Sequence, residues 1–207
     1  LWMGYVGAFR RSELAGLLFT DVKPHQSDGL HVRVRRSKVD QSGLGHVKVV
    51  PYGAEHLSCP VCAYLRWHEV VCAHDTDGRV GVMRVIYQTG PFTGHVCGQA
   101  GTVPADLRVP VFRSVHRIGT VSDRPLSGAG VHAVIRRRAA AAGYTPEQVA
   151  ELGGHSLRAG FVTEAISNGA TTHEIMRQTG HTSPATVEIY AREHAPIENN
   201  AVTRLGL

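Results

Sequence analysis

The chain contains 207 residues, of which 43% are hydrophobic, so it is long and apolar enough for one globular domain with a packed core. No apolar run approaches the roughly 20 residues of a membrane span, and residues 1–9 lack the basic front and cleavage site of an export signal. The net charge of +5 is compatible with an anionic partner such as DNA. With four cysteines and no export signal, we expect a cytoplasmic protein with free thiols and no membrane segment.

The amino-terminal residues predict two helices. Residues 1–8 read as the end of a buried helix, and Ser12 is a candidate N-cap for a second helix that directs Leu14 and Leu17 inward. Arg10 stands just before that helix, where a guanidinium and backbone N–H groups can point at a phosphate. Taken alone, an arginine at a solvated helix start is the simpler interpretation.

A hairpin follows a loop over residues 23–29. Residues 30–35 alternate as a half-exposed strand, residues 46–50 form its partner, and residues 37–43 make the turn. Lys38 lies at the end of the first strand, where a flexible ammonium could reach into a cleft. A solubilising lysine at the hairpin tip is the alternative.

The cysteines do not favour a metal site. Cys59 and Cys62 form a C-x-x-C pair at the start of a predicted helix over residues 60–74. A zinc site would need a second pair at a suitable spacing, and Cys72 and Cys97 do not supply one. We therefore expect small buried thiols and no bound metal.

Between residues 75 and 123 the sequence shows only a weak pattern of hydrophobic residues, so its secondary structure is hard to predict. Glycines from Gly78 to Gly101 break any long element, and the apolar runs 80–85 and 109–112 fit strands or simple packing. We expect a variable surface excursion of the same domain rather than a linker, because the segment stays partly apolar.

A further helix is predicted from Ser127 to about Ala142. It contains the consecutive arginines Arg136, Arg137 and Arg138, which together cover most of the helix circumference. We expect at least one of them to face a DNA backbone and at least one to face only solvent.

Three short helices are predicted near the carboxyl end. Asn168-Gly169 ends the first, a capping box of Thr171 and Glu174 starts the second, and Gly180 stops it. Ser183 followed by Pro184 starts the third. These capping residues therefore mark the boundaries between the three predicted helices.

These helices carry residues suited to phosphoryl chemistry. His155 and Arg158 are three positions apart, so they share one helix face and can converge on one anion. His181 follows the glycine stop, and Tyr190 lies about two turns into the last helix. The combination predicts phosphoryl transfer to a tyrosine.

Taken in order, short motifs along the chain resemble those of the tyrosine recombinase catalytic domain, the phage-integrase type of site-specific recombinase. The motifs are GAFRRSEL at 7–14, RSKVDQ at 36–41, GHSLRAG at 154–160, GH at 180–181 and IYAR at 189–192. Each motif is weak by itself, but their order is specific. The resemblance covers essentially the whole chain and is weakest over residues 74–123.

The resemblance implies an α+β, mainly α fold: a helical bundle with a small antiparallel β-sheet at one edge and Lys38 at its turn. Residues 1–207 would form the catalytic domain. The family's amino-terminal DNA-clamping domain has no room in these residues, and because the chain starts at Leu1 rather than Met, we expect it to be a fragment that lacks this domain. Residues 195–207 would be a tail that either contacts a neighbouring subunit or folds back on its own domain.

The resemblance also implies roles for the residues. Arg10, Arg158 and His181 would hold the charge that spreads over the non-bridging phosphate oxygens. Tyr190 would be the nucleophile, and because its reference pKa is ~10 it needs a proton acceptor, for which His155 is the candidate.

Two supporting residues complete the predicted site. Lys38 would protonate the leaving 5′ oxygen, and Glu13 would orient an arginine or histidine, although an ordinary exposed glutamate is the alternative for Glu13. The reaction requires no metal and no cofactor such as ATP, and the implied partners are double-stranded DNA and a homo-tetramer on paired sites.

Three functions fit these observations. The first is a recombinase or integrase that moves a mobile element through a 3′-phosphotyrosyl intermediate. The second is a truncated DNA-binding remnant without recombination activity. The third is DNA relaxation of the type IB topoisomerase kind, which has similar chemistry without exchange of partners.

Overall fold

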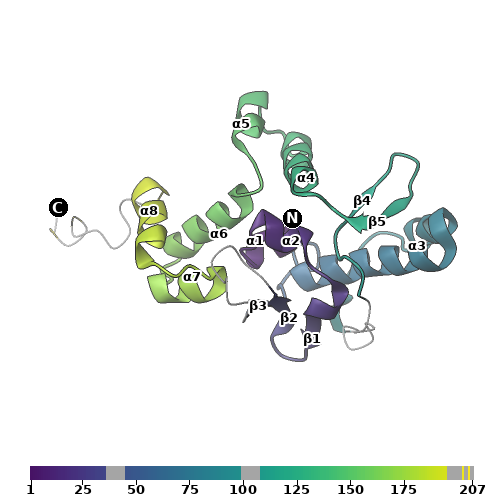
Figure 1. Ribbon diagram of the computed structural model, residues 1–207, viewed down its shortest axis with the longest axis horizontal. Helices are drawn as coiled ribbons and strands as arrows, with labels where there is room; N and C mark the ends of the chain where they lie inside the picture. The colour runs from purple at the N-terminus through teal and green to yellow at the C-terminus, as the bar shows by residue number, and fades with distance from the viewer. Residues whose placement is uncertain (36–44, 99–107, 195–201, 203–204, 206–207) are drawn as a thin grey trace.

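The computed structural model describes residues 1–35, 45–98, 108–194, 202 and 205. It confirms a mainly helical α+β domain with a small antiparallel sheet (Figure 1). The helices are α1 (Trp2–Val6), α2 (Arg11–Ala15), η1 (Phe19–Asp21), α3 (Pro60–Gln88), α4 (Gly128–Ala141), α5 (Pro146–Glu151), α6 (Ser156–Ser167), α7 (Thr172–Thr179) and α8 (Pro184–His194). The strands are β1 (Val22–His25), β2 (Gly29–Val34), β3 (His46–Val50), β4 (Arg113–Val115) and β5 (Val121–Pro125).

The main sheet has the order β1-β2-β3, and both pairs are antiparallel. The predicted hairpin strands are confirmed as β2 and β3. The first strand, β1, was predicted as loop because it contains Pro24. It tolerates this proline because it lies at an edge of the sheet, where a missing N–H breaks no ladder between inner strands.

Strand β3 directs Lys48 inward and Val47 and Val49 outward. Lys48 pairs with Val32 of β2 and is fully buried, whereas Val47 is 57% exposed. Because paired residues lie on the same face, Lys48 shares the core face with Val32. The strand thereby carries a buried ammonium beneath α2.

Helix α2 begins two residues earlier than predicted. The backbone N–H of Arg10 donates to Glu13 Oε2 at 2.9 Å, so Arg10 is the N-cap residue. The prediction of Ser12 as the cap was wrong, because Glu13 reaches back to the chain before the first turn.

Helix α3 begins as predicted but continues well beyond residue 74. Its backbone leaves the helical region at Gly78, with φ 58° and ψ −142°, and then resumes to Gln88. Residues 80–85 are therefore helical rather than strand. A Cβ at Gly81 would lie 2.1 Å from the Ala73 carbonyl oxygen, so the close return of the chain requires a glycine there.

The remainder of the 75–123 region is part of the domain, as predicted. Leu18 forms an isolated bridge with Pro110, and the indole of Trp67 donates to the Val111 carbonyl at 2.5 Å. Strands β4 and β5 then form a separate hairpin that packs on α3. Residues 99–107 lie outside the described residues.

Helices α6, α7 and α8 form a cluster beside α1 (Figure 1). Their predicted boundaries are confirmed: Thr171 and Glu174 form a capping box, Gly180 is left-handed with φ 68°, and Pro184 starts α8. The tail predicted over residues 195–207 falls outside the described residues, except for Val202 and Leu205.

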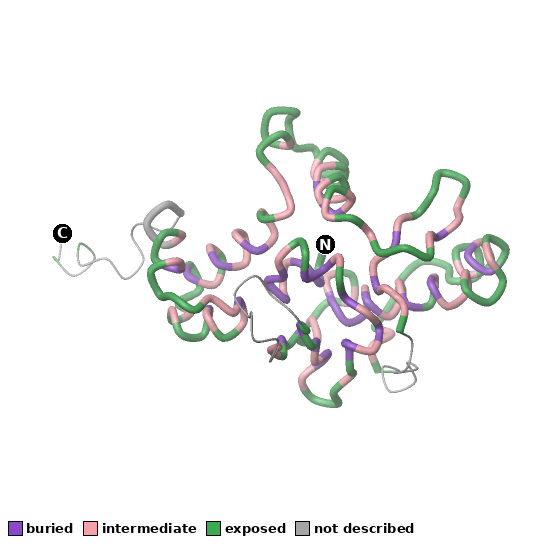
Figure 2. Tube along the Cα trace, viewed as in Figure 1, coloured by how far each residue is buried: buried purple, intermediate pink, exposed green. Residues whose placement is uncertain are grey.

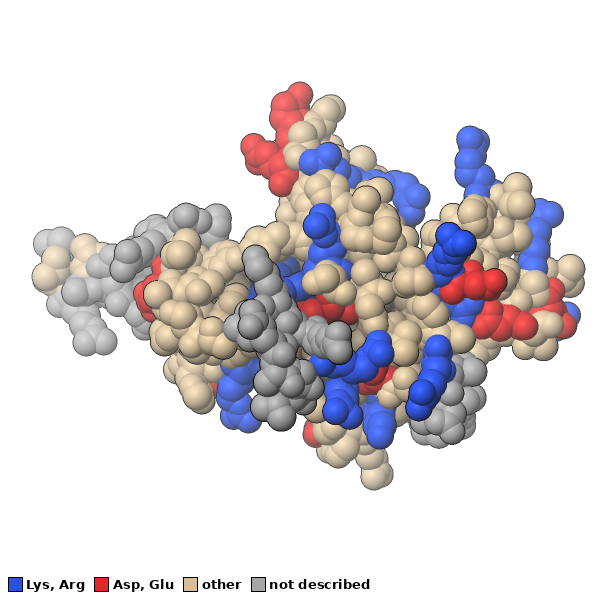
Figure 3. Space-filling model, viewed as in Figure 1, with Lys and Arg blue, Asp and Glu red and all other residues tan. Residues whose placement is uncertain are grey.

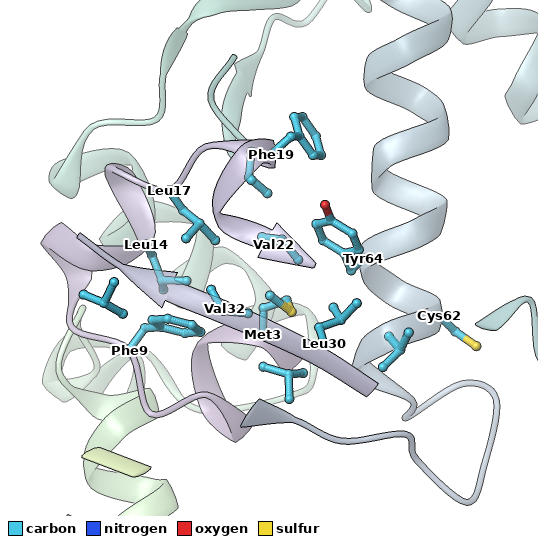
Figure 4. Close-up of a cluster of buried hydrophobic side chains, with 14 of the residues drawn as sticks. Met3, Phe9, Leu14, Leu17, Phe19, Val22, Leu30, Val32, Cys62 and Tyr64 are labelled. Atoms are coloured by element: carbon cyan, nitrogen blue, oxygen red, sulfur yellow. The ribbon is translucent and has the colours of Figure 1, made fainter. Parts of the chain in front are cut away.

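The core has two parts, visible as the purple segments of Figure 2. The larger joins α1, α2, the three-stranded sheet and α3, and includes Phe9, Leu30 and Tyr64 (Figure 4). The smaller joins α6, α7 and α8 around Val162 and Ile175. No helix within the described ranges is long and apolar enough to cross a membrane.

Candidate active site

The loop before α2 is organised by one carboxylate. Glu13 Oε1 accepts from Arg10 Nη1 at 2.7 Å, and Oε2 lies 3.4 Å from Lys48 Nζ. Burial opposes ionisation of Glu13, but Lys48 and the hydrogen bonds from Arg10 keep its pKa below the ordinary value. Glu13 is therefore a buried anion that orients two cations.

Lys48 holds the same loop from the core side. Its Nζ donates to the carbonyl oxygens of Gly7 at 3.0 Å and Ala8 at 2.9 Å, and it lies 4.7 Å from the centre of the Phe9 ring. Burial, opposed by Glu13 and reinforced by Arg158, lowers the pKa of Lys48 to about 8. Ala8 adopts a left-handed φ of 45°, which is rare for alanine, and its carbonyl oxygen accepts from Lys48 Nζ.

Arg158 links this loop to the carboxyl-terminal helices. Its Nη1 donates to the carbonyl oxygens of Ala8 and Thr179, both at 2.7 Å. Within the described residues, the buried Nη2 has no hydrogen-bond partner. A guanidinium with an unused buried donor is suited to an anionic ligand oxygen.

Thr179 also fixes the ring of His181. The hydroxyl of Thr179 donates to the Ile175 carbonyl at 2.7 Å, so at 3.1 Å it accepts from Nδ1–H of His181. The other nitrogen of His181 remains available to the site. The ring stacks on Tyr190 with centroids 6.4 Å apart.

His155 and Tyr190 are in direct contact. His155 Nε2 makes a short hydrogen bond with Tyr190 Oη, and the ring centroids are 6.0 Å apart. His155 stands at the start of α6 and Tyr190 on α8, so the packing of α6 against α8 brings them together. The predicted acceptor and nucleophile are thus neighbours.

The site accumulates positive charge. Burial, followed by Arg158, Arg10, Lys48 and His155, lowers the pKa of His181 to about 4. Burial and the same two arginines also lower the pKa of His155. Both histidines are therefore neutral near pH 7, and His155 can accept a proton while the arginines favour a bound anion.

A depression of about 610 Å³ opens beside these residues, between α2 and the start of α6. It is lined by Arg10, Arg11 and His155, together with Gly153 and Gly154. A Cβ at Gly154 would lie 2.6 Å from Arg11 Cδ, so the glycine permits the close approach of this second arginine. The depression can hold a phosphate against the helix start and the arginines.

The sequence model of the phage integrase family matches residues 105–195, which include His155, Arg158, His181 and Tyr190. The matched residues make up less than half of the chain, and this part of the chain is similar to that family.

Two curated relatives extend the comparison. The XerD homologue of Selenomonas ruminantium, an integrase/recombinase, is 27% identical over 205 residues, which are 99% of this chain and 49% of that protein. The tyrosine recombinase XerD of Xanthomonas campestris pv. campestris is 36% identical over 96 residues, 44% of this chain and 27% of that protein. The chain spans about half the length of the first relative.

Solved structures share the fold. The XerA recombinase superimposes with a TM-score of 0.54 at 18% identity, covering 99% of this chain and 56% of that one. The Tn1549 transposon integrase bound to transposon right end DNA gives 0.53 at 16% identity, covering 100% and 57%. These similarities establish the fold of a tyrosine recombinase catalytic domain.

The structure brings most of the predicted site residues together. They are Arg10, Glu13, His155, Arg158, His181 and Tyr190. Lys38 lies outside the described residues. Sequence reasoning missed Lys48 and Thr179, whose roles depend on contacts between distant segments. No pattern within residues 46–50 marks Lys48 as an inward residue, because the inward face of β3 is set by its pairing with β2.

Proposed function

We propose that this domain breaks and rejoins double-stranded DNA at specific sites by transferring a DNA phosphate to Tyr190. The observation that carries the proposal is the contact between His155 Nε2 and Tyr190 Oη beside Arg158 and Arg10. A tyrosine, a neutral base and two guanidiniums are the groups needed for attack on a phosphodiester.

In the proposed step, Tyr190 Oη attacks the phosphorus and its proton passes to His155 Nε2. Arg10, Arg158 and His181 hold the non-bridging oxygens, on which negative charge develops. The bond from phosphorus to the 5′ oxygen breaks, and the phosphate stays attached to the 3′ side as a phosphotyrosyl ester. A 5′ hydroxyl of a second DNA end can then reverse the step.

His181 has to change protonation during this process. With Nδ1–H held by Thr179, the neutral ring presents an acceptor nitrogen to the site. A bound phosphate would favour the protonated ring, which is a donor on both nitrogens. We infer that DNA binding charges His181.

The leaving 5′ oxygen needs a proton, and we assign this role to Lys38 by family resemblance. Lys48 is unsuited to it, because its Nζ is buried against the Gly7 and Ala8 carbonyls. Lys48 is a positioning residue in this scheme.

We further propose that the domain acts as a homo-tetramer on paired DNA sites, moves a mobile element, and works with an amino-terminal clamping domain outside these 207 residues. Figure 3 shows Lys and Arg side chains around the sheet and α2 and also near α4 and the β4–β5 hairpin, while Asp and Glu gather at the tip of α5 and near α3. A basic surface of this kind would give DNA affinity that falls steeply with salt.

The test uses a pool of duplexes that carry a nick and randomised sequence around it. Cleavage near the nick releases a short fragment, which traps the covalent complex on a denaturing gel. We expect a covalent band with the unaltered chain and with Tyr87→Phe, an exposed control, but none with Tyr190→Phe. DNA binding without any band would favour the remnant, and plasmid relaxation without partner exchange would favour the topoisomerase function.

A further inference from the structure

Four potential metal ligands meet at the start of α3, outside the active site. Cys59 and Cys62 come from the C-x-x-C pair, and His95 and Cys97 come from the segment that follows α3. The ligand atoms of all four lie within 4.8 Å of one another. Cys72 and Cys97 do not form a second cysteine pair; Cys97 instead joins this group together with His95, because the chain after α3 returns to the beginning of that helix.

The spacing of these atoms fits a tetrahedral ion. His95 Nδ1 lies 3.4 Å from the sulfur of Cys62 and 3.4 Å from the sulfur of Cys97. Zinc bonds of about 2.3 Å to sulfur and about 2.1 Å to nitrogen place these atoms roughly 3.6 Å apart at a tetrahedral angle. The observed separations between nitrogen and sulfur are therefore close to the separation expected between two ligands of one tetrahedral zinc ion.

A backbone carbonyl fixes the protonated nitrogen of His95. Its Nε2 lies 3.1 Å from the Ala54 carbonyl oxygen, so Nε2–H donates there and Nδ1 keeps its lone pair. A ligating histidine commonly has its second nitrogen held in this way by a carbonyl. This hydrogen bond leaves Nδ1, the nitrogen that faces the sulfurs, able to bind a metal ion.

The backbone also stabilises thiolates. Cys59 Sγ accepts from the N–H groups of Gly53 at 3.3 Å and Cys62 at 3.5 Å, and Cys62 Sγ accepts from Val96 N–H at 3.4 Å. Backbone donors of this kind favour the ionised sulfur that a metal ligand requires.

The sulfur of Cys62 is directed away from the hydrophobic core. In Figure 4 it lies at the edge of the labelled cluster and points away from Leu30 and Tyr64. A cysteine that only fills core volume would direct its sulfur inward. The orientation favours a ligand role.

We propose that Cys59, Cys62, His95 and Cys97 bind one structural Zn²⁺. Because the protein supplies all four ligands, the site is closed to substrate and its role is to hold the fold. It fastens the segment after α3 to the beginning of that helix. The same segment already contacts α3 through Arg66, which lies 3.9 Å from the centre of the Phe92 ring and donates to the Gly94 carbonyl at 3.2 Å.

The test measures metal content in the 207-residue chain, purified under reducing conditions without chelator. We expect about one zinc per chain by elemental mass spectrometry. Replacement by Co²⁺ should give the visible spectrum of a tetrahedral thiolate complex. The matched control is Cys72→Ser, because Cys72 contacts His68 rather than this cluster and should keep the metal.

His95→Ala and Cys62→Ser should both lose stoichiometric zinc. His95 is exposed, so His95→Ala tests the site without opening the core, and its circular dichroism should stay that of the folded chain. Three results would overturn the proposal: less than about a tenth of a zinc per chain even after incubation with zinc, retention of zinc by His95→Ala, or a Cys59–Cys62 disulfide in the native protein. None of these readouts depends on DNA cleavage, so they are independent of the role of Tyr190.

Discussion

Lys48 Nζ lies 3.4 Å from Glu13 Oε2, and both side chains are sealed from solvent, with 0% and 1% exposure. The pair joins strand β3 to helix α2 directly beneath Arg10. Since Lys48 also holds the Gly7 and Ala8 carbonyls, one buried ammonium fixes the backbone that presents the first arginine.

Replacing Lys48 by methionine should lower the free energy of unfolding by about 3–5 kcal/mol, because the buried Glu13 would keep only Arg10 as a cationic partner and the Gly7 and Ala8 carbonyls would lose their donor. Urea denaturation would measure the change. Lys23→Met, at an exposed position on β1, should leave stability unaltered. The double variant Lys48→Met with Glu13→Gln should recover part of the loss, and a single Lys48→Met variant as stable as the unaltered chain would refute the role of the pair.

Arg136 and Arg138 should behave differently although they are near neighbours on α4. Arg136 Nε donates to the Leu152 carbonyl at 2.8 Å and its Nη2 donates to the Ala150 carbonyl, so it ties α4 to the end of α5. Arg136→Ala should cost about 1–3 kcal/mol of stability, because those acceptors lose a charged donor. Arg138 is exposed, and Arg138→Ala should be neutral in thermal unfolding. Equal losses for both variants would contradict this division.

Stability should rise with pH between about 4 and 6.5. The pKa of His181 is lowered from 6.5 to about 4 in the folded chain, so in this window the unfolded chain binds more protons. The stabilisation is complete above pH 6.5 and is lost as the pH falls toward 4. His181→Gln should flatten the dependence measured by urea denaturation at several pH values, and an unchanged slope would show that other groups cause it.

His155→Gln should reduce the rate of covalent complex formation by about 10²–10⁴, the usual contribution of a general base. DNA affinity should change little, because the arginines proposed to hold the phosphate remain. His116→Gln, at an exposed position in the β4–β5 hairpin, is the matched control. A His155→Gln rate within a factor of about two of the unaltered chain would assign the proton to another group.

The carboxyl-terminal helices could be predicted because their boundaries are set by residues close to them in the sequence. Thr171 with Glu174, Gly180 and Pro184 each act within one turn, and together they place Tyr190 on its helix. The contact of Tyr190 with His155 could be predicted only through family resemblance, since it depends on the packing of α6 against α8.

Features built from distant segments could not be read from the sequence. The inward face of β3 depends on its pairing with β2, which turns Lys48 rather than Val47 and Val49 toward the core. The cluster of Cys59 with His95 likewise depends on the length and kink of α3, and Gly78 suggested a break rather than a continuing helix. Periodicity within one segment contains no information on such contacts.

The most direct test of the central claim is to identify the amino acid that carries the DNA. Covalent complexes trapped on nicked duplexes would be digested with nuclease and protease, and the modified peptide sequenced by mass spectrometry. We predict a nucleotide attached through a 3′ phosphate to Tyr190, with no adduct in Tyr190→Phe. An adduct on another residue, or one that persists in Tyr190→Phe, would contradict the proposed mechanism.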